Sequence, residues 1–200
     1  MLRSAWLWVS RVSFWFWLRL GGYKTWSQIY RVIWEKEFRD MPLKAYDNLD
    51  QLSAKLQANA GKWRADSWKQ LYDAVSYPGK AQTVFDGVIS PEVGFDCDDF
   101  AIYITNVLDL SLVLSKLPVA EPRFFTVCWM RGWKGAGHNV CLVKLPDGAY
   151  AYMDYGVPRG HEVNPAAVAA LVIANYAAGA DMIGWAISKR DLTPVEVRRG

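Results

Sequence analysis

The chain has 200 residues, of which 52% are hydrophobic and eleven are tryptophan, and its formal net charge is +3. This length suffices for one compact domain with a sizeable core, and the small charge, without a basic stripe, argues against a nucleic-acid partner. The three cysteines are an odd number, so we expect reduced thiols, with Cys128 and Cys141 in the core, rather than a disulfide framework.

The start of the chain is rich in tryptophan and arginine, and we expect residues 1–22 to be distinct from a domain over residues 23–200. A helical wheel places arginines and serines on one half and most aliphatic residues on the other, with Trp8 and Trp15 on the polar half. The apolar runs are too short to span a bilayer, and Arg11 interrupts a signal-peptide core. The segment either docks on a membrane surface or a partner protein, or packs on its own domain. Because aromatic residues nearly encircle the helix, we favour docking.

The next part of the chain has apolar residues at helical spacing, separated by helix-breaking residues. We expect a helix that begins near Thr25 and ends before Pro42, a helix from Leu49 to Gly61, a helix over residues 68–75 stopped by Pro78-Gly79, and a loop over residues 80–95. This loop leads to the most informative motif of the sequence and is a candidate lining for a substrate groove.

The motif places a cysteine where the loop turns into a further helix, in the sequence Gly94-Phe95-Asp96-Cys97-Asp98-Asp99-Phe100-Ala101. Asp96 is a good N-cap residue, and the apolar residues that follow predict a buried helix whose first residue is Cys97. There the unpaired backbone N–H groups and the positive end of the helix dipole favour a thiolate, the reactive form of cysteine. The neighbouring aspartates oppose this effect, because negative charge raises the pKa of a thiol, so a base must assist.

The second half of the chain alternates strand-like runs with turn residues. We expect a strand over residues 124–130, a flexible glycine-rich connection over residues 131–137, strand-like runs over residues 138–145 and 150–155, a final helix from Asn164-Pro165 to near Gly179, and a last strand over residues 182–188. The two strand-like runs flank a tripeptide typical of a hairpin loop.

This hairpin loop determines which side chains share a side of the sheet. Pro146-Asp147-Gly148 suits a three-residue loop, which sets Asp154 opposite Val140 and on the same side as His138. A diagonal of this kind is roughly 7–8 Å, a span that Asp and His side chains can close. We therefore expect the Asp154 carboxylate to orient the His138 imidazole.

These residues make a candidate catalytic triad. Cys97 would attack a carbonyl carbon, His138 would take the thiol proton and later protonate the leaving group, and Asp154 would stabilise the imidazolium. The backbone N–H of Cys97 is one candidate oxyanion donor, and the sequence does not identify a second. The only other histidine, His161, follows in a loop-like stretch and is the alternative base if the hairpin register differs.

The sequence gives no positive signal for a metal or a cofactor. It lacks Cys-x-x-Cys and His-x-x-x-His pairs, the glycine and distal glutamate of a calcium loop, and a glycine-rich phosphate loop. Asp98 and Asp99 are most simply explained as charges that complement a helix N-terminus. We therefore expect neither a bound metal nor a cofactor.

The run Asp96-Cys97-Asp98-Asp99-Phe100-Ala101, followed by His138 and Asp154, resembles the transglutaminase-like superfamily, in particular the small bacterial transglutaminase-like cysteine peptidases. In that family the cysteine starts a buried helix, and the histidine and aspartate lie on neighbouring strands. The resemblance covers roughly residues 63–160. It implies an α+β, papain-like fold in which a helical N-terminal half carries the cysteine helix, packed on a small antiparallel sheet.

The resemblance also implies a chemistry, namely covalent thiol catalysis by a hydrolase or acyl transferase on an amide or peptide substrate. It does not specify the substrate, because the superfamily includes peptidases, amidases, acyl transferases and inactive members. The alternative is a non-catalytic structural or binding protein with the same fold, docked to a membrane or a larger assembly through residues 1–22.

Overall fold

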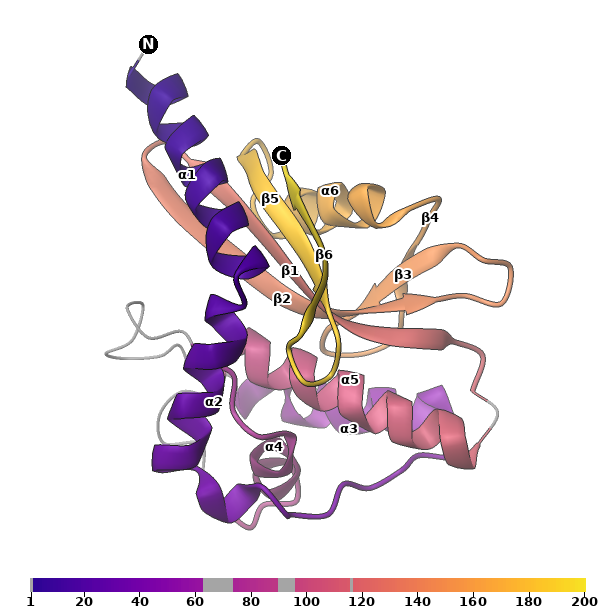
Figure 1. The fold of residues 1–200 in the computed structure, drawn as a ribbon. Helices are drawn as coiled ribbons and strands as arrows, with labels where there is room; N and C mark the ends of the chain where they lie inside the picture. The colour runs from indigo at the N-terminus through magenta and orange to yellow at the C-terminus, as the bar shows by residue number, and fades with distance from the viewer. Residues whose placement is uncertain (1, 63–73, 90–95, 116) are drawn as a thin grey trace.

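The computed structural model describes residues 2–62, 74–89, 96–115 and 117–200, and these residues form an α+β fold (Figure 1). The helices are α1 (Leu2–Arg19), α2 (Gly22–Trp34), α3 (Leu49–Asn59), α4 (Pro78–Phe85), α5 (Cys97–Leu114) and α6 (Pro165–Tyr176), with short 3-10 turns at Lys36–Phe38 and Ala60–Lys62. The strands are β1 (Ala120–Arg131), β2 (Lys134–Lys144), β3 (Tyr150–Met153), β4 (Arg159–Glu162), β5 (Asp181–Ser188) and β6 (Pro194–Arg199). They form one antiparallel sheet in the order β4-β3-β2-β1-β5-β6, which confirms the predicted α+β class.

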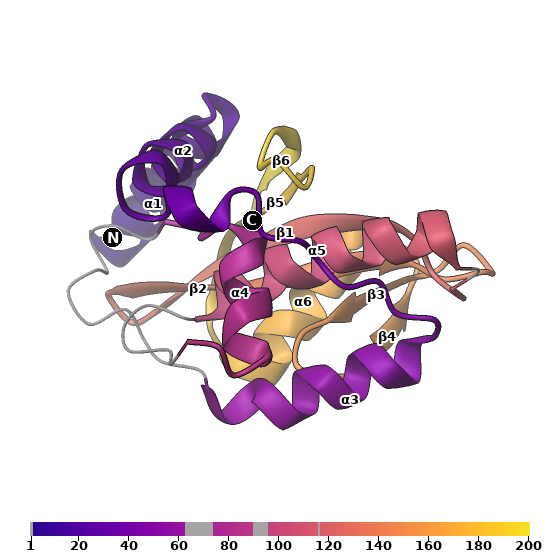
Figure 2. The ribbon, with the colours of Figure 1, turned by 90° about the horizontal axis from the view of Figure 1, so that it is seen from below.

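Helices cover both faces of the sheet, because side chains along each strand alternate between two cores. On one face, Phe125 of β1 packs in a cluster with Val168 and Val172 of α6. On the other face, Phe124 packs in a cluster with Ile102 of α5. Figure 1 shows α5 below the sheet and α6 above it, and Figure 2, seen from below, shows α3, α4 and α5 in front of the sheet. The buried cysteine-bearing helix predicted from the sequence is thus confirmed, on a larger sheet than expected.

The segment before the cysteine helix differs from the prediction. Residues 80–85, expected to be part of a loop, belong to helix α4, which begins at Pro78. Proline suits the first turn of a helix, since its missing N–H would have no partner there, so Pro78 starts a helix instead of ending one. The helix expected over residues 68–75 lies mostly outside the described residues, and residues 74–77 are not helical.

The predicted flexible connection over residues 131–137 is instead part of a long hairpin. Strand β1 continues to Arg131 and β2 starts at Lys134, so only Gly132 and Trp133 form the turn. Gly132 has φ +65°, a left-handed conformation that suits glycine at the first position of a two-residue hairpin turn. The prediction that β5 is the last strand is also wrong, because β6 follows it at the sheet edge.

Helix α1 packs with one side on the sheet. Arg3 forms an ion pair with Asp181, and the Arg11 guanidinium donates to the carbonyl oxygen of Met182 at 3.0 Å. Leu18, near the end of α1, is buried in the cluster that contains α5. The first helix is therefore attached to β5 and to the core by specific contacts.

The opposite sides of α1 and α2 expose many large apolar residues, which we call the outer apolar face. Its members on α1 are Leu2, Trp6, Trp8, Val9, Phe16 and Trp17, Leu20 follows directly after this helix, and the members on α2 are Ile29, Val32, Ile33 and Trp34. The side of α2 that faces the domain is polar, since Ser27 and Arg31 are buried there. Within the described ranges, no helix combines the length and apolar character needed to cross a membrane.

Candidate active site

Cys97 is the first residue of α5, as predicted. Asp96 is the N-cap, and its carboxylate accepts a hydrogen bond from the backbone N–H of Asp98 at 3.1 Å. The Cys97 side chain is half-buried, whereas Cys141 is fully buried in the core and burial raises the pKa of its thiol to about 12. Cys97 therefore differs from Cys141 in both exposure and position.

His138 and Asp154 form a direct pair, because the hairpin register matches the prediction. Cys141 lies opposite Met153 and Lys144 opposite Tyr150, as a three-residue loop requires. The His138 Nε2 and Asp154 Oδ2 atoms are 3.0 Å apart, and both side chains are buried. A carboxylate can only accept in such a bond, so an ionised Asp154 selects the tautomer or the cation that carries a proton on Nε2.

Tyr176, the last residue of α6, covers this pair. Its hydroxyl donates to the same Asp154 oxygen that His138 contacts, and its ring centroid is 4.1 Å from that of the imidazole. The other oxygen, Asp154 Oδ1, is buried and has no hydrogen-bond partner among the described residues. Sequence reasoning missed Tyr176, because only the packing of α6 across the sheet brings it to His138.

The start of α5 and the imidazole–carboxylate pair lie on opposite faces of the sheet, and Tyr155 lies between them. His138 and Asp154 lie on the face that α6 covers, whereas α5 lies on the opposite face. Tyr155 follows directly after Asp154, and its ring lies 6.4 Å from the His138 ring and 4.8 Å from that of Phe100 on α5. Burial raises the pKa of Tyr155, and the charges of Asp154 and Cys97 add to this shift. One phenol ring thus connects the first turn of α5, through Phe100, with the imidazole–carboxylate pair.

A second tyrosine connects the helix and the strand beside the candidate residues. The Tyr23 hydroxyl of α2 donates to Asp98 at 3.2 Å and accepts from the side-chain amide of Asn139 at 3.4 Å. Asp98 follows Cys97 in the sequence, and Asn139 follows His138. Tyr23 therefore holds the start of α5 near the part of β2 that carries the imidazole, and sequence reasoning missed this residue.

Residues 74–77 are held between α2 and α5 by buried polar groups. Arg31 donates to the carbonyl oxygens of Val75 and Ser76 at 2.8 and 2.7 Å. The backbone N–H of Ser76 donates to the Asp99 carboxyl at 2.9 Å. These bonds tie the segment before α4 to the first turn of the cysteine helix.

The same region contains a buried cluster of charges. Glu35 accepts from Lys80 Nζ at 2.6 Å and from the Ser76 hydroxyl at 2.9 Å. Burial, opposed by the Lys80 ammonium and reinforced by the Glu35 carboxylate, raises the pKa of Asp99 to about 7. Asp99, in the first turn of α5, therefore has a raised pKa in addition to the favourable charge of a carboxylate near a helix N-terminus.

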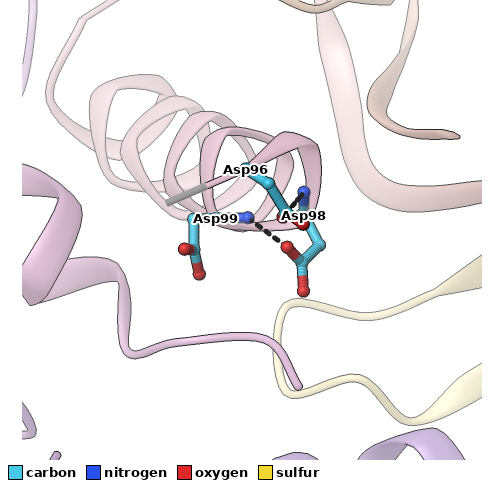
Figure 3. Close-up of side chains that lie close together, drawn as sticks. All are labelled: Asp96, Asp98 and Asp99. Atoms are coloured by element: carbon cyan, nitrogen blue, oxygen red, sulfur yellow. Dashed lines mark hydrogen bonds between the residues drawn. The ribbon is translucent and has the colours of Figure 1, made fainter. Parts of the chain in front are cut away.

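The three acidic residues at the start of α5 lie close together, with ligand atoms within 4.8 Å of one another (Figure 3). Their oxygens serve as acceptors within the protein. Asp98 accepts from the backbone N–H of Asp99 at 3.0 Å and from Tyr23, and Asp96 and Asp99 accept the bonds described above. These bonds give the trio a structural role at the helix start.

The alternative base, His161, lies away from the pair. It contacts Asp147 of the hairpin loop, and both side chains are exposed. The hydrogen bond to Asp147 raises the pKa of His161. The pKa of Asp147 is lowered, mainly by the hydrogen bond from the Ala149 backbone N–H and also by the bond with His161. His161 therefore contacts the loop that sets the register, at the surface.

Comparisons with protein-family models, with curated proteins and with solved structures each found no match.

Proposed function

We propose that the chain is a cysteine-dependent hydrolase or acyl transferase, with a papain-like, transglutaminase-like domain, that acts on amide or peptide bonds. The observation that carries the proposal is the 3.0 Å contact between His138 Nε2 and Asp154, formed on the part of β2 that Tyr23 ties to the cysteine helix. An imidazole bound through Nε2 keeps Nδ1 as the atom that can exchange a proton with a thiol.

The roles follow from the chemistry of these groups. His138 accepts the Cys97 proton, and the thiolate sulfur forms a bond to the substrate carbonyl carbon. The backbone N–H of Cys97 at the helix start stabilises the resulting oxyanion. The carbon–nitrogen bond then breaks, the amine leaves with the proton from His138, and the thioester is resolved by water in hydrolysis or by a second amine in acyl transfer.

The direct test is the relative reactivity of the three thiols. We expect iodoacetamide at pH 7 to alkylate Cys97 at least about tenfold faster than Cys128 or Cys141, because an imidazole partner raises the thiolate fraction. Peptide mass spectrometry after timed quenching measures the three rates in one sample. Equal rates for Cys97 and the half-buried Cys128 would contradict the proposal and favour the non-catalytic alternative.

We also propose that the outer apolar face binds an anionic membrane surface, which would remove its large apolar side chains from water. The exposed residues of α1 and α2 include four tryptophans and Arg19, and the exposed Lys36 follows α2, whereas Arg3, Lys24 and Arg39 pair with aspartates. Tryptophan and arginine suit a helix that lies in a membrane interface. The chain would then attach to the membrane surface through α1 and α2, and the candidate active site would act on substrates near that surface.

We expect the full chain to bind phosphatidylcholine vesicles that contain phosphatidylserine, with a blue shift of tryptophan emission. The double substitution Trp8→Ala, Trp34→Ala is expected to weaken binding by at least about tenfold, because two large apolar groups no longer enter the interface. Val113→Ala, on an exposed position at the far end of α5, is the control. Equal binding of all three proteins, or none, overturns the membrane proposal, and self-association without vesicles would indicate a protein partner.

A further inference from the structure

Strand β2 is longer than the strand that pairs with its outer side. Strand β3 pairs only with Cys141 to Lys144, whereas β2 begins at Lys134. Along residues 134–140, none of the residues that the structure describes pairs with this side of β2, although β1 pairs with the other side along the whole stretch. The backbone groups of this open edge are therefore available to another strand.

The alternation of an antiparallel ladder shows which groups point outward. The Leu145 N–H donates to the Ala149 carbonyl across the hairpin loop, so Leu145 directs its backbone groups toward β3. Every second residue before it does the same, because β2 has no register shift over this stretch. The N–H and C=O groups of Asn139, Gly137 and Gly135 therefore point to the open edge.

The side chains along this edge leave it accessible. Residues 134–137 are exposed and include Gly135, Ala136 and Gly137, so little side-chain bulk stands beside the outward groups. A side chain at Gly137 would meet the Cys128 sulfur at 2.9 Å, which explains that glycine by packing. A Cβ atom at Gly135 would lie 3.9 Å from the Ile183 side chain, an ordinary van der Waals distance, so packing does not require glycine at this position.

The open edge ends at the candidate active site. From Cys141 onward the same side of β2 is occupied by β3, and the chain leaves β3 through Asp154 and Tyr155. A strand added to the edge therefore reaches Asn139, next to His138, and must leave the sheet there. Its backbone would pass the imidazole–carboxylate pair and the adjacent start of α5.

From this geometry we infer that the substrate is an extended polypeptide segment that binds as an additional strand on residues 135–139 of β2. The inference rests on the proposed function and narrows its substrate class to polypeptides, because a small amide cannot pair with the strand edge. Backbone pairing supplies affinity that is largely independent of substrate side chains. The substrate class is therefore an unfolded or loosely structured protein region.

The test compares two reagents that alkylate Cys97, acetyl-tetra-alanyl chloromethyl ketone and iodoacetamide. In the first reaction the sulfur bonds to the methylene carbon and chloride leaves, and only this reagent carries a peptide backbone. We expect Gly135→Pro to slow the tetra-alanyl reagent by about tenfold, because proline removes an outward N–H and blocks pairing, and to leave the iodoacetamide rate unchanged. Gly135→Ala, which keeps the N–H, is the matched control and is expected to react like the wild type.

The outcomes separate the two hypotheses. Fast iodoacetamide labelling of Cys97 with no effect of Gly135→Pro on the tetra-alanyl reagent overturns strand addition and leaves the proposed function intact. Slow labelling of Cys97 by iodoacetamide in the wild type overturns both. If the proline variant does not fold, a reagent N-methylated at alternate residues replaces it, and an undiminished rate for that reagent also overturns strand addition.

Discussion

His138→Asn is expected to slow the iodoacetamide reaction of Cys97 at pH 7 by about a hundredfold, and any amide turnover by at least as much. Asparagine is close to histidine in size and can still contact Asp154, so the fold should persist while proton transfer is lost. The rate of carbamidomethylation at Cys97, followed by mass spectrometry with pseudo-first-order analysis, measures the effect. A pH series shows whether the lost group titrates.

The second histidine supplies the matched control for this measurement. His161 also contacts a carboxylate, but it is exposed and lies at the hairpin loop. His161→Asn should leave the Cys97 rate within about twofold of the wild type, since general-base assistance acts only from a group within reach of the proton. If both substitutions have the same small effect, His138 is not the base and the proposed chemistry fails.

Asp99→Asn is expected to change the pH dependence of stability. In the folded chain the pKa of Asp99 is raised to about 7, compared with an ordinary value of 3.8, so the folded state binds a proton that the unfolded state has lost. The contribution of Asp99 is therefore fully present below about pH 4 and is lost as the pH rises through 7. Asparagine can still accept from the Ser76 N–H and cannot titrate.

Urea unfolding between pH 4.5 and pH 7.5 measures this effect. The wild type should lose stability relative to Asp99→Asn by about 1 kcal/mol for each pH unit on average in this range, below the limit of about 1.4 kcal/mol set by one proton. Asp50→Asn, an exposed position in the first turn of α3, is the control and should parallel the wild type. Parallel curves for Asp99→Asn and the wild type would show that Asp99 is ionised throughout, with Lys80 neutralising it.

The features predicted correctly from the sequence depend on a few consecutive residues. Asp96 caps a helix through its own side chain, so the position of Cys97 at the helix start follows from local chemistry. Pro146-Asp147-Gly148 fixes the loop length, and the loop length alone brings Asp154 to the side of His138. Short-range rules therefore sufficed for the pair and for the cysteine helix.

The features that were missed depend on contacts between distant parts of the chain, or on residues whose local pattern is compatible with two different structures. Tyr176 and Tyr23 reach the site only through the packing of α6 and α2, which no local pattern encodes. Pro78 suits the first turn of a helix as well as its end, and the glycines of residues 131–137 suit a long hairpin as well as a flexible loop. In both cases the sequence signal was real and its interpretation was ambiguous.

The Tyr23 phenol connects helix α2 to the two residues that follow Cys97 and His138 in the sequence, Asp98 and Asn139. On its opposite side the same helix carries Ile33 and Trp34 in contact with solvent. Whatever binds there holds the helix that anchors the residues following Cys97 and His138. If the proposed attachment and chemistry hold, a surface that binds α2 would also act on the spacing between Cys97 and His138 through this one helix.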